Sequence, residues 1–129
     1  MIIVKLFGGL GNQMFQYACG RAMSLRTGKK LILDISQYID YRGERSYSLK
    51  NFNIKAQILK SLEERNVLIK EIGNDRLRLL KETQFQFDSS IIQIKDSVVL
   101  AGYWQSEKYF DDKRANILYD VTPAVNSIS

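Results

Sequence analysis

An apolar run at the N-terminus that leads directly into three glycines constrains the fold more than any other feature. Residues 1–7 (MIIVKLF) form a short apolar stretch that ends at Gly8. Such a run, bounded by glycine, is typical of a strand buried on both faces. From residue 14 onward apolar residues recur at three- and four-residue steps, as on one face of a helix. They are Met14, Phe15, Ala18, Cys19, Ala22 and Met23. The pattern predicts a strand, a tight glycine turn and a helix that buries Cys19.

A second buried strand follows that helix. Gly28, with Lys29 and Lys30, is typical of a helix C-terminus, because glycine adopts the left-handed conformation and cations favour the negative end of the helix dipole. The apolar run at residues 31–34 then predicts a strand. A strand, helix and strand with short connections indicate a right-handed crossover in a parallel sheet. We therefore expect an α/β, Rossmann-like parallel sheet with flanking helices, with residues 1–7 at its centre and residues 31–34 beside them.

Further elements are expected along the rest of the chain. The first are a long polar loop at residues 36–48, a short strand at 51–54, and a helical region at 57–82 broken at Gly73-Asn74-Asp75. A strand or extended segment around Phe85 and Phe87 and a third buried strand of the sheet at 97–103 follow. The last is a helix at 106–119, with Tyr109, Phe110, Ile117 and Leu118 on its apolar side and Pro123 after it.

Composition excludes several kinds of site. One cysteine and no histidine among 129 residues rule out an intrachain disulfide and argue against a structural zinc site. The commonest general base of enzymes is also missing. The net charge of +5 would suit an anionic partner, but the basic residues are interspersed with acidic ones. Residues 1–9 are too short for a signal or membrane-spanning segment. We expect a single cytoplasmic domain over residues 1–129, with peripheral attachment to the inner face of the cytoplasmic membrane left open.

The glycine turn, residues 8–13, is the first candidate binding site. Glycine permits positive φ and close approach of a ligand to the backbone, and a helix start attracts phosphate. Gly9 and Gly11 fit a dinucleotide fingerprint, but Met14 stands where its third glycine belongs, and the lysine and hydroxyl of a P-loop are missing. The alternative is a purely structural turn with Asn12 as the helix N-cap. If the glycines serve only the turn, alanine there should cost stability by resisting positive φ.

A second junction between a strand and a helix lies at residues 100–110 (LAGYWQSEKYF). Tyr103 and Trp104 lie at the end of the expected strand and offer rings for stacking on a sugar or a base. The alternative is that Trp104 packs at the rim of the core. Ser106 followed by Glu107 suits a helix N-terminus.

Together these two stretches resemble the bacterial α-1,2-fucosyltransferase family, glycosyltransferase family 11. The resemblance rests on GGLGNQMFQYACGRA and GYWQSEKYF, extends through LILDIS, LKNFNI and FQFDSSII, and so covers almost the whole chain. Family members are longer, and their His-x-Arg-Arg-Gly-Asp motif follows a strand that would begin here near Ile128. The resemblance therefore implies that residues 1–129 are an N-terminal domain from which the C-terminal, donor-binding domain is absent.

The resemblance also implies a function. Members of the family are two-domain, GT-B-type glycosyltransferases whose Rossmann-like halves face a cleft. The implied reaction is metal-independent, inverting transfer of L-fucose from GDP-fucose to the 2-hydroxyl of a galactose in a glycan acceptor, without a cofactor and without nucleic acid as a partner. Arginines of the missing half would neutralise the diphosphate. The fragment alone is expected to be inactive.

Seven substrate-binding residues are implied at the cleft: Gly9, Gly11, Asn12, Gln13, Tyr103, Trp104 and Gln105. The glycines would admit the donor, and the two amide side chains of the turn would bind sugar hydroxyls or phosphate oxygens. Both stretches follow strands of one sheet, so we expect them at the same sheet edge. Glutamine is a poor helix cap, so Gln13→Ala is expected to leave stability nearly unchanged.

Other polar residues have weaker assignments. Arg21 and Arg26 are expected to be surface or helix-flank residues. The catalytic base is unknown, and Asp34 and Glu107 are candidates by location only. Two other functions stay open: a nucleotide-dependent oxidoreductase domain that binds a dinucleotide at the turn, and a non-catalytic module that binds anions or nucleic acid.

Overall fold

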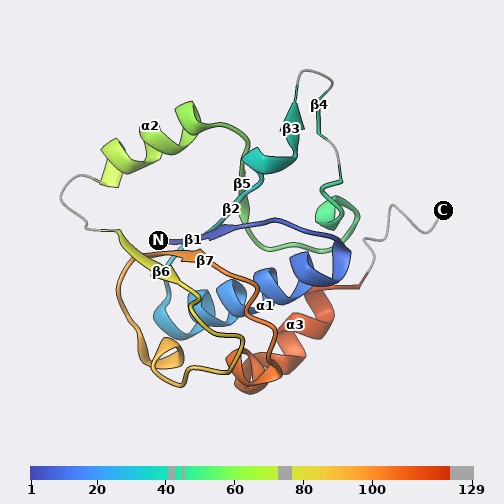
Figure 1. Cartoon of the computed structure of the whole chain (residues 1–129), viewed down its shortest axis with the longest axis vertical. Coiled ribbons are helices and arrows are strands. Elements are labelled where there is room, and N and C mark those ends of the chain that lie inside the picture. Colours follow the sequence, from blue (N-terminus) through green and yellow to red (C-terminus); the bar gives the residue numbers. More distant parts are fainter. Residues whose placement is uncertain (41–42, 45, 73–76, 123–129) are drawn as a thin grey trace.

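The computed structural model describes residues 1–40, 43–44, 46–72 and 77–122 (Figure 1). At its centre is a five-stranded, wholly parallel sheet of order β5-β2-β1-β7-β6. The strands are β1 (Ile2–Lys5), β2 (Leu31–Asp34), β5 (Gln57–Leu59), β6 (Arg78–Lys81) and β7 (Val98–Ala101). A separate antiparallel hairpin joins β3 (Ile39–Asp40) to β4 (Gly43–Glu44). The expected α/β, Rossmann-like fold is confirmed, with β1 central and β2 and β7 as its neighbours.

Among the described residues, three α-helices accompany the sheet: α1 (Leu10–Thr27), α2 (Leu62–Ile72) and α3 (Arg114–Asp120). α1 returns the chain from β1 to β2, and α2 lies between the two edge strands β5 and β6 in the chain (Figure 1). As expected, α1 ends at Gly28, which has a φ of 73° and donates its N–H to the carbonyl oxygen of Ser24. None of the helices in the described ranges is long and apolar enough to cross a membrane.

The central strand is covered on both faces. Ile2 and Val4 of β1 share a cluster with Tyr17 of α1, whereas Ile3 points to the opposite face, in a cluster that includes Leu68 of α2. Cover on both faces explains why β1 is apolar at consecutive positions.

The lone cysteine lies in this core, as the sequence predicts. Cys19 on α1 is 1% exposed, and burial raises the pKa of its thiol to about 12. It therefore behaves as a small apolar side chain.

The helical region predicted at residues 57–82 is wrong at both ends. Only Leu62–Ile72 is α-helix, and the flanking segments are the edge strands β5 and β6. These strands are three and four residues long, and pairing with β2 and β7 supplies hydrogen bonds that a local pattern does not reveal. The break predicted at residues 73–75 lies outside the described residues.

Several shorter predictions also need correction, mostly because the chain uses 3₁₀ turns. The predicted loop at 36–48 contains a 3₁₀ turn (Ser36–Tyr38) and strands β3 and β4, and the predicted strand at 51–54 begins in a second 3₁₀ turn (Leu49–Asn51) and is not a strand. The segment around Phe85 and Phe87 is loop. The predicted helix at 106–119 is two 3₁₀ turns (Glu107–Tyr109 and Asp111–Lys113) followed by α3.

The segment after β7 begins as the sequence predicts. The Ser106 hydroxyl caps its first turn by accepting the N–H of Lys108. Tyr109 and Ile117 are buried, but Leu118 is 57% exposed and does not belong to the apolar side. Pro123 lies outside the described residues.

Two arginines of α1 are tied to the C-terminal segment rather than free on the surface. Arg21 pairs with Asp120 of α3 at 2.7 Å, and Asp120 is only 1% exposed. The Tyr17 hydroxyl donates to the same carboxylate at 2.6 Å, and burial together with this hydrogen bond raises the pKa of Tyr17. Arg26 pairs with Asp112 at 2.8 Å. Both arginines lie on the flank of α1 and are partly exposed, and ion pairs join them to the segment that packs against this helix.

Removal of the buried carboxylate should destabilise the fold strongly. Asp120→Ala leaves the Arg21 guanidinium and the Tyr17 hydroxyl without their shared acceptor, and we expect a loss of about 3 kcal/mol in the free energy of unfolding. Asp112→Ala is the matched control, because that carboxylate is 55% exposed and its removal should cost less than about 1 kcal/mol. Urea denaturation measures both, and equal losses would show that Asp120 does not anchor α3.

Candidate functional site

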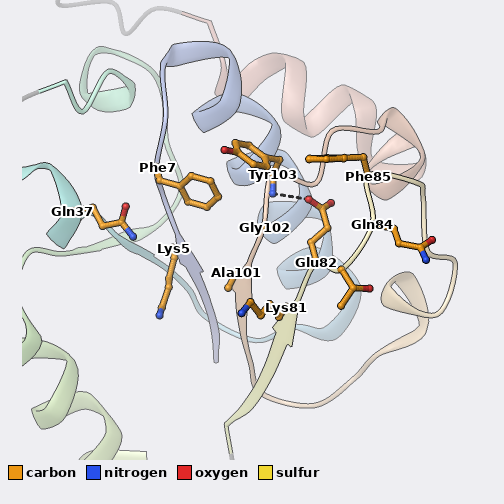
Figure 2. A pocket seen from close by; sticks show the side chains of 11 residues that line it. Lys5, Phe7, Gln37, Lys81, Glu82, Gln84, Phe85, Ala101, Gly102 and Tyr103 are labelled. Carbon is orange, nitrogen blue, oxygen red and sulfur yellow. Dashed lines mark hydrogen bonds between the residues drawn. The ribbon is translucent and has the colours of Figure 1, made fainter.

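The candidate site is a cleft at the carboxyl-terminal edge of the sheet, where β1, β7 and β6 end. Its volume is about 380 Å³, and its walls include Lys5, Phe7, Lys81, Glu82, Phe85 and Tyr103 (Figure 2). Open α/β sheets bind ligands in the crevice outside the carboxyl ends of their strands. The cleft therefore lies at the usual ligand-binding position of this fold class.

Aromatic rings and lysines line the cleft together. The Tyr103 ring meets Phe7 edge-on, with centroids 4.7 Å apart, and lies 6.1 Å from the Phe85 ring. Phe85 is 77% exposed, so its ring is accessible to a ligand in the cleft. Lys5 and Lys81 add positive charge (Figure 2). The combination suits a ligand with both a ring and an anionic group.

Glu82 fixes the turn that presents Tyr103. Its carboxylate oxygens accept the backbone N–H of Tyr103 at 3.0 Å (Figure 2) and that of Trp104 at 3.1 Å. Trp104 has a φ of 54°, a strained conformation for a bulky side chain. At Gly102 a Cβ atom would lie 2.4 Å from the Glu82 Cβ, so the close approach requires glycine. Sequence reasoning missed Glu82, because only the pairing of β6 with β7 brings it to this turn.

The glycine turn differs from the predicted one. α1 begins at Leu10 with Gly9 as its N-cap, so the N-cap predicted at Asn12 is wrong and Asn12 lies in the first helical turn. Gly8, with a φ of 81°, makes the left-handed turn after which the helix begins at Leu10. No side chain caps this terminus and its first turn has no acidic residue. The N–H groups of that turn therefore face solvent or an anionic ligand.

Gly9 and Gly11 do not need positive φ. Gly9 has a φ of −82°, and a Cβ atom at either residue would meet nothing within 4 Å. The expectation that alanine at these positions resists the turn is therefore wrong, because Gly8 carries that conformation. Open space above both glycines is compatible with a ligand that approaches the backbone, and their substrate-binding role stays a prediction.

Gln13 is a structural tether. Its side chain is fully buried, and its Nε2 donates to the carbonyl oxygens of Gly8 at 3.0 Å and Ser46 at 2.9 Å. Its Oε1 accepts the N–H of Ser48 at 2.9 Å. The Tyr38 hydroxyl also donates to the Gly8 carbonyl, at 2.8 Å. The expectation that Gln13 hardly affects stability is wrong, because its buried side chain joins the glycine turn to Ser46 and Ser48. The sequence did not reveal this, because these two serines lie 33 and 35 residues away. Its contact with substrate remains untested.

The two sequence stretches do meet at one edge of the sheet. Gln105 Nε2 donates to Asn12 Oδ1 at 2.6 Å, which joins the turn after β7 to the start of α1. Trp104, in contrast, is 2% exposed and meets the Tyr109 ring edge-on at 5.6 Å. The structure therefore places the Trp104 ring in the core, the alternative that the sequence left open.

Neither carboxylate suggested as a base lines the cleft. Asp34 is 5% exposed and its Oδ1 accepts the N–H of Ser36 at 3.0 Å. Glu107 is exposed and pairs with Arg114 at 2.8 Å. Within the described ranges, no group of three or more acidic or cysteine side chains is placed to hold a metal ion.

Comparisons with known proteins point to glycosyltransferases. The chain is 31% identical over 131 residues to an alpha-1,2-colitosyltransferase of Escherichia coli, and the matched region covers 95% of this chain and 45% of that protein. It is 29% identical over 136 residues to the O-antigen biosynthesis glycosyltransferase WbnK of Escherichia coli, at 88% and 45% coverage. The chain thus spans about half the length of these relatives. No family model matches it, and neither does any solved structure.

Gln13→Ala should destabilise the protein. It leaves the Ser48 N–H without its acceptor and removes one of the two donors to the Ser46 carbonyl oxygen, and we expect a loss of about 2 kcal/mol in the free energy of unfolding. Gln105→Ala, which removes one exposed hydrogen bond, is the control and should cost less than about 1 kcal/mol. Urea denaturation separates the two, and a Gln13→Ala protein as stable as wild type would exclude the tether.

Alanine substitutions at Gly8 and at Gly11 should have different effects on stability. Gly8→Ala forces alanine into a positive φ and against Asn12 Nδ2 at 2.5 Å, so we expect a loss of more than about 1 kcal/mol. Gly11→Ala lies in a helix with open space, so it should be neutral or stabilising by up to about 1 kcal/mol. Thermal melts test both, and a destabilised Gly11→Ala protein would mean that this helix start is packed more tightly.

Proposed function

We propose that residues 1–129 form the N-terminal, Rossmann-like part of a GT-B-type, metal-independent α-1,2-fucosyltransferase. The reaction transfers L-fucose from GDP-fucose to the 2-hydroxyl of a galactose in a glycan, with inversion. The observation that carries the proposal is the cleft of aromatic rings and lysines at the carboxyl edge of the sheet. The printed names of both relatives support sugar transfer, and one of them specifies an α-1,2 linkage.

The cleft and the start of α1, which follows the cleft residue Phe7 in the chain, suit different parts of a sugar nucleotide. Lys5 and Lys81 attract a diphosphate, and the rings of Tyr103 and Phe85 stack on a sugar or a base. The uncapped start of α1 offers N–H groups to an oxygen of the ligand, and Gly11 leaves it open. Arginines supplied by the other half of the enzyme would complete the neutralisation of the diphosphate.

The chemistry is a single displacement. The 2-hydroxyl oxygen of the acceptor bonds to the anomeric carbon as the bond to the GDP oxygen breaks, and the hydroxyl proton passes to a base. Glu82 lines the cleft, but both of its oxygens already accept backbone N–H groups. Its role is to hold the Tyr103 turn, and we assign the base to no residue of this chain.

Colitose is the second candidate for the transferred sugar, because one relative is named for it. Colitose is fucose without the 3-hydroxyl, so the same cleft geometry would accept either sugar. The two donors differ by one hydroxyl, and a site that hydrogen-bonds that hydroxyl would discriminate strongly against colitose.

The other functions considered have less support. Met14 packs against the core at the position where a dinucleotide fingerprint has its third glycine. A non-catalytic anion-binding module would bind random oligonucleotides, with an affinity that falls steeply with salt. Neither function explains the glycosyltransferase relatives.

The test is a transfer assay on the product of the full reading frame that encodes this chain. It should transfer fucose from GDP-fucose to lactose in the presence of EDTA, whereas residues 1–129 alone should show no measurable turnover. GDP-colitose in a parallel reaction decides between the two sugars. A strict metal requirement, or turnover by residues 1–129 alone, would contradict the proposed mechanism or the division between the halves.

Two variants link that activity to the turn. Gly11→Ala should lower transfer about tenfold or more, because it blocks N–H groups that would bind a charged oxygen, while the melting temperature holds. Asn12→Ala, which loses one hydrogen bond to Gln105, should lower transfer about ten- to a hundredfold. Gln105→Ala removes the same hydrogen bond and reports whether that bond alone matters. Wild-type turnover in all three would remove the turn from the site.

A further inference from the structure

A second cleft adjoins the first along the chain that leaves β6. Its volume is about 280 Å³, and it shares Lys81, Glu82, Thr83 and Gln84 with the first cleft. Its remaining walls include Gln86, Phe87, Asp88, Trp104 and Tyr109. One four-residue stretch therefore borders both clefts, and a ligand that extends beyond the first cleft has a path into the second.

The second cleft has the chemistry of a neutral sugar site. Gln84 and Gln86 offer amides that both donate and accept, and the Phe87 and Tyr109 rings lie with centroids 4.8 Å apart. The side chains of Glu82 and Asp88 disfavour a second anionic group. Lys81 is the lysine shared with the first cleft, and Lys108 lies over the Phe87 ring at 5.6 Å. Amides beside aromatic rings suit hydroxyl groups and the apolar face of a sugar ring.

One residue that lines this cleft, Trp104, carries an unsatisfied donor. Among the described residues, the Nε1 of Trp104 has no hydrogen-bond partner, although the side chain is 2% exposed. A buried donor without a partner costs about 1–3 kcal/mol. An oxygen of a bound sugar, or a water that the sugar holds in place, would satisfy this donor after a small movement of the wall. The indole N–H is thus a donor that such a movement would make available to an acceptor oxygen of a ligand.

We propose that the second cleft binds a neutral sugar residue of the acceptor glycan, next to the residue that receives the transferred sugar in the first cleft. This inference rests on the proposed glycosyltransferase function and adds the acceptor class. The enzyme then requires at least a disaccharide for tight acceptor binding, and the stretch shared by both clefts sets the spacing of the two sugar residues.

The sequence provides a direct probe, because Trp104 is its single tryptophan. The indole N–H therefore gives one assigned signal in a ¹⁵N NMR spectrum of the 129-residue chain. Lactose should shift this signal and the side-chain amide of Gln86, and galactose alone should shift them less. GDP should instead shift the backbone signals of Lys5 and Tyr103. Lactose signals confined to Lys5 and Tyr103, or absent altogether, would overturn the second cleft as a sugar site.

A pair of exposed glutamines supplies the variants. Gln86→Ala should weaken lactose binding about fivefold, as for one lost neutral hydrogen bond, without changing the melting temperature. Gln93→Ala is the control, because Gln93 is also exposed but lines neither cleft. In the full reading-frame product, Gln86→Ala should raise the KM for lactose about fivefold and leave the KM for galactose unchanged. Equal effects on both acceptors, or none, would contradict the assignment.

The two proposals fail separately. Lactose binding at the Trp104 indole by a full product that transfers no sugar would overturn the proposed function and leave a neutral sugar site. Sugar transfer by the full product without any response of the indole signal or of Gln86→Ala would overturn the second cleft and support the proposed function.

Discussion

The pairing of β1 with β7 is the constraint on which the rest of the structure depends. It sets the ends of two strands, far apart in the sequence, side by side in a parallel sheet. Phe7 then meets Tyr103, and Asn12 is bonded to Gln105. Without this pairing, the glycine turn and the turn after β7 would have no common edge. The candidate site is therefore a property of the sheet and not of either turn alone.

Glu82 connects that sheet to both clefts. Because its carboxylate accepts two backbone N–H groups, the turn at Trp104 can hold a positive φ that the side chain alone would disfavour. The same turn presents Tyr103 to the first cleft and places the Trp104 indole at the wall of the second. The Glu82 carboxylate thus lines two adjoining clefts and fixes the turn that contributes Tyr103 to one and Trp104 to the other.

Different residues of the glycine turn have different roles. Gly8 makes the left-handed turn and Gln13 ties that turn to Ser46 and Ser48, whereas Gly9 and Gly11 meet no neighbour that would exclude a side chain. Structural need therefore explains Gly8 and Gln13 but leaves the other two glycines unexplained. A ligand close to the backbone at the uncapped helix start would explain both, and it is consistent with glycosyltransferase relatives.

The sequence alone determined the β1-α1-β2 unit, the buried Cys19 and the helix end at Gly28, because each depends on local periodicity or on one residue's backbone preference. Only the tertiary structure decided the roles of β6, Gln13, Glu82 and Trp104. Gln13 meets partners 33 and 35 residues away, and Glu82 bonds to a turn 21 residues away. Edge strands of three or four residues carry too little pattern to be recognised. Hydrogen bonds across such distances exist only once the strands have paired, so no local reading of the sequence reveals them.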